Sequence, residues 1–174
     1  MYSSSYVIIS DVHRRERAVV EVLKRQVRPV DALVFCGDGL NALNCLDLQL
    51  GTNVNIFAVW GNWDAAARRL IYFSGFVEDV PEERVIFLDG KKILLMHGHT
   101  RGVKYSLVAA IAAARREGAD ALIFGHTHEA VCFLDKGAGE ERPLWVFNPG
   151  ALENGEFGTL EIRDGVMLFS HGKI

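Results

Sequence analysis

The chain of 174 residues is 49% hydrophobic and 24% charged, which is typical of a soluble globular protein that folds as one domain. A net charge of −3, without a run of Lys and Arg, argues against a nucleic-acid-binding face, and no apolar stretch is long enough to cross a membrane. Three cysteines without C-x-x-C spacing indicate neither a disulfide framework nor a thiolate zinc site. Because the N-terminus does not resemble a signal peptide, we expect a cytoplasmic protein with a single domain over residues 1–174.

The first half of the chain alternates between predicted strands and helices. In chain order these are a strand over Tyr6–Ser10, a helix from Ala18 to Val27 that stops at Arg28-Pro29, strands over Ala32–Cys36 and Val54–Trp60, and a short helix over Ala65–Phe73. A β-α-β order predicts neighbouring parallel strands, and ligands of such sheets collect beyond the carboxyl ends of the strands.

The second half begins with a predicted hairpin and ends in strands alone. Its elements are strands over Val85–Leu88 and Ile93–His97 around an Asp89-Gly90 turn, a helix over Val103–Glu117, a strand over Leu122–Gly125, and strands over Val131–Leu134, Leu144–Phe147, Phe157–Ile162 and Val166–His171. We find no repeat or linker, which favours one domain.

Five short polar clusters follow the predicted strands. They are Ser10-Asp11-Val12-His13, Gly37-Asp38-Gly39, Gly61-Asn62-Trp63-Asp64, Met96-His97-Gly98-His99 and Gly125-His126-Thr127-His128. Each cluster alone is explained by a turn or a helix cap. All five in order at strand ends predict a shared site, and residues two apart on an extended segment point to the same side.

Asp, His and Asn side chains bind divalent metal ions through oxygen and imidazole nitrogen. The ligand types suit Mn²⁺, Fe or Zn²⁺ and do not choose among them. We expect two divalent ions, Mn²⁺ first, with Fe, Zn²⁺ or Ni²⁺ as the alternatives. Two metal ions held together bind a bridging water, lower its pKa and direct it at phosphorus, so the pattern indicates phosphoester cleavage.

The ordered motifs D-x-H, G-D, G-N-x-D, H-G-H and G-H-T-H resemble those of the calcineurin-like metallophosphoesterases, in particular the small prokaryotic phosphodiesterases. The resemblance extends from Asp11 to Asn148-Pro149-Gly150 and implies a four-layer αββα sandwich of two mixed β-sheets flanked by helices. It also implies the metal ligands: Asp11, His13 and His128 for one ion, Asn62, His97 and His126 for the other, and Asp38 bridging both.

Two positions depart from the family pattern. Trp63 stands where the most familiar members have a His that protonates the leaving group, and an indole does not serve as such an acid. We therefore expect faster turnover of esters with acidic leaving groups. Asp64 then has two interpretations, a catalytic acid or the N-cap of the Ala65–Phe73 helix, and we favour the cap.

Three further side chains are candidates for contact with substrate. Arg14, where the family often has Gly, either binds a substrate phosphate or is a solvated residue at the start of the first helix. Arg101 carries the same two interpretations. His99 orients a ligand, contacts substrate or replaces the missing acid.

These observations favour a di-metal phosphodiesterase that cleaves a nucleotide, a cyclic nucleotide or another small phosphodiester. The alternative from another class is a non-catalytic, metal-binding interaction protein on the same fold, like the retromer subunit of this family. A metal-dependent hydrolase of another ester or amide also fits the ligands alone. Oligomeric state is not encoded in a recognisable pattern.

Overall fold

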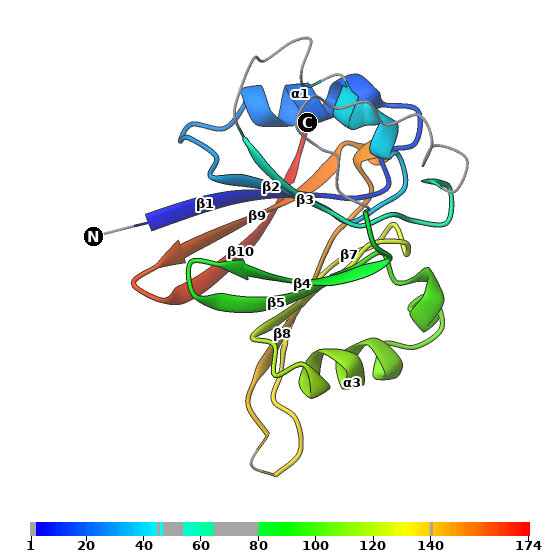
Figure 1. The fold of residues 1–174 in the computed structure, drawn as a ribbon. Helices are drawn as coiled ribbons and strands as arrows, with labels where there is room; N and C mark the ends of the chain where they lie inside the picture. Colours follow the sequence, from blue (N-terminus) through cyan, green and yellow to red (C-terminus); the bar gives the residue numbers. More distant parts are fainter. Residues whose placement is uncertain (1–2, 45, 47–53, 65–79, 140) are drawn as a thin grey trace.

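The computed structural model describes residues 3–44, 46, 54–64, 80–139 and 141–174. Two five-stranded mixed sheets pack face to face, and one helix lies on the outside of each sheet (Figure 1). The four layers confirm the predicted αββα sandwich. In the described part of the chain, no helix is long and apolar enough to span a membrane.

The first sheet has the strand order β10-β9-β1-β2-β3. Strands β1, β2 and β3 are parallel, as the β-α-β pattern predicts, and β9 joins β1 antiparallel. The outer helix of this sheet, α1, spans Glu16–Lys24 and stops three residues before the predicted end. The strands are β1 (Ser3–Ile9), β2 (Ala32–Phe35), β3 (Asn55–Ala58), β9 (Glu156–Arg163) and β10 (Val166–Lys173).

The second sheet has the strand order β4-β5-β6-β8-β7. Strands β5, β6 and β8 are parallel, and the hairpin partners β4 and β7 form the two antiparallel edges. Its outer helix is α3 (Val108–Arg116). The strands are β4 (Glu83–Leu88), β5 (Lys91–Met96), β6 (Ala121–Ile123), β7 (Ala130–Asp135) and β8 (Leu144–Pro149).

Three apolar clusters fill the spaces between the four layers. One lies between α1 and the first sheet, one between the two sheets, and one between the second sheet and α3. Strands such as β2 are therefore buried on both faces, which is why their sequences are continuous apolar runs rather than alternating ones.

The helix predicted over Val103–Glu117 begins five residues later than expected. Gly102 adopts a positive φ of 63°, and its carbonyl accepts the amides of Tyr105 and Ser106 in a separate turn. This turn follows the 3₁₀ helix η3 (His99–Arg101); two further 3₁₀ helices are η1 (Leu40–Leu43) and η4 (Leu152–Asn154). The predicted Ala65–Phe73 helix lies outside the described residues.

Candidate metal centre

The five polar clusters converge between the two sheets, beyond the carboxyl ends of the strands that precede them. The loops after β1, β2 and β3 come from the first sheet, and those after β5 and β6 from the second. Backbone hydrogen bonds join neighbouring loops: Asp11 N donates to Gly37 O at 2.9 Å, and Gly125 N donates to His97 O at 3.1 Å. Sheet topology thus brings residues more than 100 positions apart into one place.

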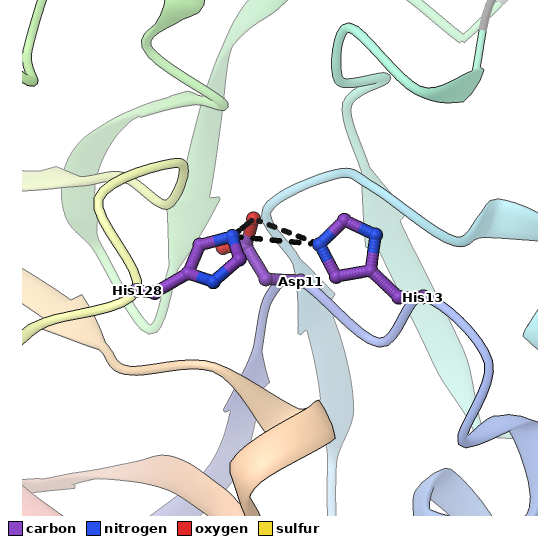
Figure 2. A group of neighbouring side chains, drawn as sticks. All are labelled: Asp11, His13 and His128. Atoms are coloured by element: carbon purple, nitrogen blue, oxygen red, sulfur yellow. Dashed lines mark hydrogen bonds and ion pairs between the residues drawn. The ribbon is translucent and has the colours of Figure 1, made fainter.

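Asp11, His13 and His128 form the first group, which we call the outer trio. The two imidazoles lie on either side of the Asp11 carboxylate and direct a nitrogen toward it (Figure 2). The Nε2 atoms of His13 and His128 are 3.4 Å apart, and Asp11 Oδ1 lies 3.1 Å from His128 Nε2 and 3.9 Å from His13 Nε2.

The outer trio fits a cation. Asp11 Oδ2 accepts hydrogen bonds from Ser10 Oγ at 2.6 Å and His126 N at 3.0 Å. Asp11 Oδ1, by contrast, is buried, and its polar neighbours among the described residues are the Nε2 atoms of His128 and His13. A buried carboxylate oxygen that faces two imidazole nitrogens is the donor set that a divalent ion satisfies.

Glu153, from η4, contacts His128 and the backbone of Asp11 in the outer trio. Its Oε1 lies 3.0 Å from His128 Nδ1, and its backbone N–H donates to Asp11 O at 3.1 Å. A proton on Nδ1 shared with this carboxylate leaves the Nε2 lone pair of His128 free for a metal ion. The hydrogen bond with Asp11 and, more weakly, the charge of Glu153 raise the pKa of His128 against the effect of burial.

Asp38, His97 and His126 form the second group, the inner trio. His97 is fully buried, and its Nδ1 lies 2.7 Å from the carbonyl oxygen of Cys36, a contact that requires the proton on Nδ1. His97 Nε2 then faces Asp38 Oδ2 and Asn62 Oδ1, each at 3.2 Å. Three donor atoms therefore surround one point, and Asn62, predicted as a ligand, is placed beside this trio.

The inner trio also carries strong pKa shifts. Burial opposes ionisation of Asp38, but the hydrogen bond and charge of His97 bring its pKa below the usual value. Burial likewise opposes protonation of His97, yet its contacts with Asp38 and the charge of Asp11 raise its pKa. Burial and the charge of His97 lower the pKa of His126 to about 4, which keeps that imidazole neutral and available as a ligand.

The ligand segments are not extended, contrary to the sequence prediction. The residues with positive φ include Asp11 (52°), His13 (45°), Asp38 (61°), His126 (68°) and His128 (61°). Such left-handed conformations are uncommon outside glycine and gather where the surrounding structure enforces them. The side chains converge because the loops curl, and not because alternate residues of a strand share a face.

The Asp64 carboxylate links the loop after β2 to the loop after β3 through hydrogen bonds. It is 1% exposed, and its carboxylate accepts four backbone N–H groups at 2.8–2.9 Å: those of Asp38 and Gly61 on Oδ2, and those of Gly39 and Leu40 on Oδ1. All of its acceptor capacity is used inside the loops. The sequence did not predict this role, and the Ala65–Phe73 helix that Asp64 was expected to cap lies outside the described residues.

The approach of the loops is too close for side chains at two glycines. A Cβ on Gly37 would lie 2.7 Å from Gly61 N and 2.9 Å from His97 Nδ1, and Gly37 has a φ of 91°. A Cβ on Gly61 would collide with the Asp38 carboxylate. These glycines allow Asp38 and Asn62 to come together.

Both trios open into one cavity of about 690 Å³. Arg14 and Trp63 line this cavity. His99 and Arg101 are not among the described residues that line it. Arg101 forms a bidentate ion pair with Glu83 at 2.6 and 2.8 Å. His99 packs beside Trp60 and His97, with ring centroids 5.4 Å apart in each case.

Several residues that line the cavity were not predicted from the sequence, among them Glu153 and Lys104. Glu153 follows Asn148-Pro149-Gly150 in a short 3₁₀ helix, and Lys104 lies in the turn before α3 and lines the cavity. Neither belongs to one of the five polar clusters, because each reaches the site through tertiary packing.

Comparison with known proteins agrees with this geometry. Residues 5–170 match the model of the calcineurin-like phosphoesterase superfamily domain. A probable metallophosphoesterase of Bacillus subtilis, YsnB, is 30% identical over 146 residues, which cover 84% of this chain and 73% of the relative. Phosphodiesterase MJ0936 of Methanocaldococcus jannaschii is 29% identical over 152 residues, covering 82% and 81%.

The same fold occurs in a protein that is not named as a phosphoesterase. The structure of vacuolar protein sorting 29 from Cryptosporidium parvum superimposes with a TM-score of 0.67 at 17% identity, covering 100% of this chain and 99% of that protein. At this identity the likeness establishes the fold alone.

Proposed function

The chain belongs to the calcineurin-like phosphoesterase superfamily, and we propose that it is a di-metal phosphodiesterase that hydrolyses a small phosphodiester or nucleotide. The observation that carries the proposal is the pair of Asp/His trios that open side by side into one cavity. Paired divalent sites of this kind are suited to displacement at phosphorus.

In the proposed assignment, Asp11, His13 and His128 hold one ion, Asn62, His97 and His126 hold the other, and Asp38 contacts both. Two bound divalent ions supply an activated water and neutralise charge on the phosphoryl oxygens. The chain supplies the orientation: Glu153 and the Cys36 carbonyl hold the protons on the Nδ1 atoms of His128 and His97.

In this proposal, neither Trp63 nor Asp64 protonates the leaving group. Trp63 occupies the position of the family's acid, and the Asp64 carboxylate is committed to four backbone N–H groups. In hydrolysis the water oxygen loses a proton and bonds to phosphorus, and the bond from phosphorus to the leaving oxygen breaks. The leaving oxygen then takes up a proton. Since solvent supplies this proton, esters with acidic leaving groups should react fastest.

The test compares bis-(p-nitrophenyl) phosphate with p-nitrophenyl phosphate after the protein is stripped of metal and Mn²⁺ is added back. We expect metal-dependent turnover that favours the diester and falls at least about 100-fold in Asp38→Asn, because this change removes a carboxylate shared by two ions. A protein that binds Mn²⁺ but hydrolyses neither ester would contradict the proposal.

That negative outcome would favour the second candidate, a metal-binding interaction protein. The likeness to vacuolar protein sorting 29 motivates it, together with Trp63 in place of the usual acid. Against it stands the ligand set, since both carboxylates, Asn62 and all four imidazoles are present and close together.

A further inference from the structure

The cavity has room and polarity beyond what two metal ions and a single phosphate require. Its volume of about 690 Å³ falls within the range of roughly 300–1,000 Å³ that is typical of pockets for whole small molecules. Residues outside the predicted ligand set also line it, among them Arg14, Trp63 and Lys104. These three side chains indicate which chemical groups the substrate has besides the phosphate that is cleaved.

Trp63 is an exposed aromatic residue that lines the cavity. Its side chain is 72% exposed, although tryptophan is normally among the more buried residues. Its backbone is nevertheless fixed, because Trp63 N donates to Asp38 Oδ1 at 2.8 Å. The indole meets the His13 ring edge-on, with centroids 5.8 Å apart and an interplanar angle of 87°. An exposed indole on a fixed loop beside the outer trio offers a surface on which a planar ring can stack.

Three cations line the same cavity. Arg15 donates to the carbonyl oxygen of Glu153 at 3.2 Å, which leaves Arg14 and Lys104 as the two candidates for phosphate binding. Arg14 directly follows His13 in the chain, and Lys104 enters from the turn before α3. Lys104 lines the cavity together with His126 of the inner trio and His128 of the outer trio. Within the described residues neither of these two candidates has an ion-pair partner, in contrast to Arg101, which is paired with Glu83. Unpaired cations beside a metal centre suit phosphate oxygens.

From these three features we infer that the substrate is a nucleoside phosphodiester, whose base stacks on Trp63 while Arg14 and Lys104 bind its phosphate oxygens. This inference rests on the proposed function. A simple alkyl diester would leave the indole exposed and most of the cavity unfilled, whereas a nucleoside phosphodiester supplies a flat ring, a sugar and an anionic phosphate.

The experiment uses two esters with the same leaving group. Thymidine 5′-(p-nitrophenyl phosphate) and methyl p-nitrophenyl phosphate both release p-nitrophenolate and differ only in the other alcohol. With Mn²⁺ added, we expect a higher kcat/KM for the thymidine ester. Trp63→Leu should reduce the ratio of the two kcat/KM values by roughly 5- to 100-fold, the range that stacking of a base on an aromatic residue gives. Trp63→Phe should retain most of the ratio.

The matched control is Phe87→Leu. Phe87 is also an exposed aromatic residue, 65% accessible, but it lies on β4 and does not line the cavity. This variant should leave both rates unchanged. Arg14→Gln and Lys104→Gln should slow both esters to similar extents, because the esters share the phosphate.

The outcomes separate the inference from the function on which it rests. If the methyl ester is hydrolysed with metal but the thymidine ester is not preferred, or if the preference survives in Trp63→Leu, the substrate inference is wrong and the phosphodiesterase proposal stands. If neither ester is hydrolysed, the proposed function is wrong. Quenching of tryptophan fluorescence by thymidine 5′-monophosphate, lost in Trp63→Leu, would then still support the base-binding subsite.

Discussion

The outer and inner trios use the same ligand types but are held in place differently. In the inner trio, His97 is fully buried and is oriented by a backbone carbonyl, that of Cys36. In the outer trio, the His128 side chain is 34% exposed and is oriented by Glu153, whose side chain is 35% exposed. His97 is thus oriented by the backbone, whereas His128 is oriented by one partly exposed side chain.

The same contrast applies to the loops. Asp64 holds the Asp38 and Gly61 loops through four buried hydrogen bonds, so the inner trio is part of the cooperative core. Around the outer trio, the partly exposed Glu153 carboxylate lies 3.0 Å from His128 and 3.8 Å from His13, and the Glu153 backbone donates one hydrogen bond to Asp11. Mutations should therefore affect stability at the inner trio and metal affinity at the outer one.

The largest expected effect is that of Asp64→Ala on folding. The change leaves four buried N–H groups without their acceptor, and we expect the free energy of unfolding to fall by at least about 3 kcal/mol. Urea denaturation of the metal-free protein measures this loss. Glu141→Ala, at an exposed carboxylate of a surface ion pair, is the control and should cost less than about 1 kcal/mol.

Asp64→Asn separates this role from that of a catalytic acid. The amide keeps one acceptor oxygen but places an NH₂ group against the other pair of N–H donors, so stability should again fall. A variant as stable as the parent that has lost its turnover would show instead that Asp64 acts in catalysis.

The sequence predicted most of the fold and the Asp and His side chains that cluster in the two trios. Apolar runs and turn residues are local signals, and parallel strands bring their carboxyl ends to one edge. The left-handed conformations of Asp11 and His126 were not predictable in this way, because tertiary contacts impose them. Glu153 and Lys104 were missed for the same reason, since neither belongs to a motif and packing alone brings each to the cavity.

Glu153→Gln tests whether the outer trio depends on a single orienting carboxylate. Loss of a carboxylate that orients a ligating histidine typically weakens metal binding about 10- to 100-fold. We expect calorimetric titration with Mn²⁺ to show this decrease at one of two sites, with the other unchanged. Glu156→Gln provides a comparison nearby, since that carboxylate contacts the backbone of Ala151 and no metal ligand. Equal weakening of both sites in Glu153→Gln would contradict the separation of the two trios.

The smallest effect concerns protons, and it compares one imidazole from each trio in the metal-free protein. The pKa of His128 is raised above its ordinary value by Asp11 and Glu153, whereas burial and the charge of His97 lower the pKa of His126 to about 4. As the pH falls, protons should therefore compete for His128 first, while His126 stays neutral until the pH approaches 4. NMR titration of the imidazole resonances measures both. In Glu153→Gln the pKa of His128 should decrease, because a neighbouring negative charge is lost, and that of His126 should not change. If the two imidazoles titrate together, the trios share one electrostatic environment and the contrast between them fails.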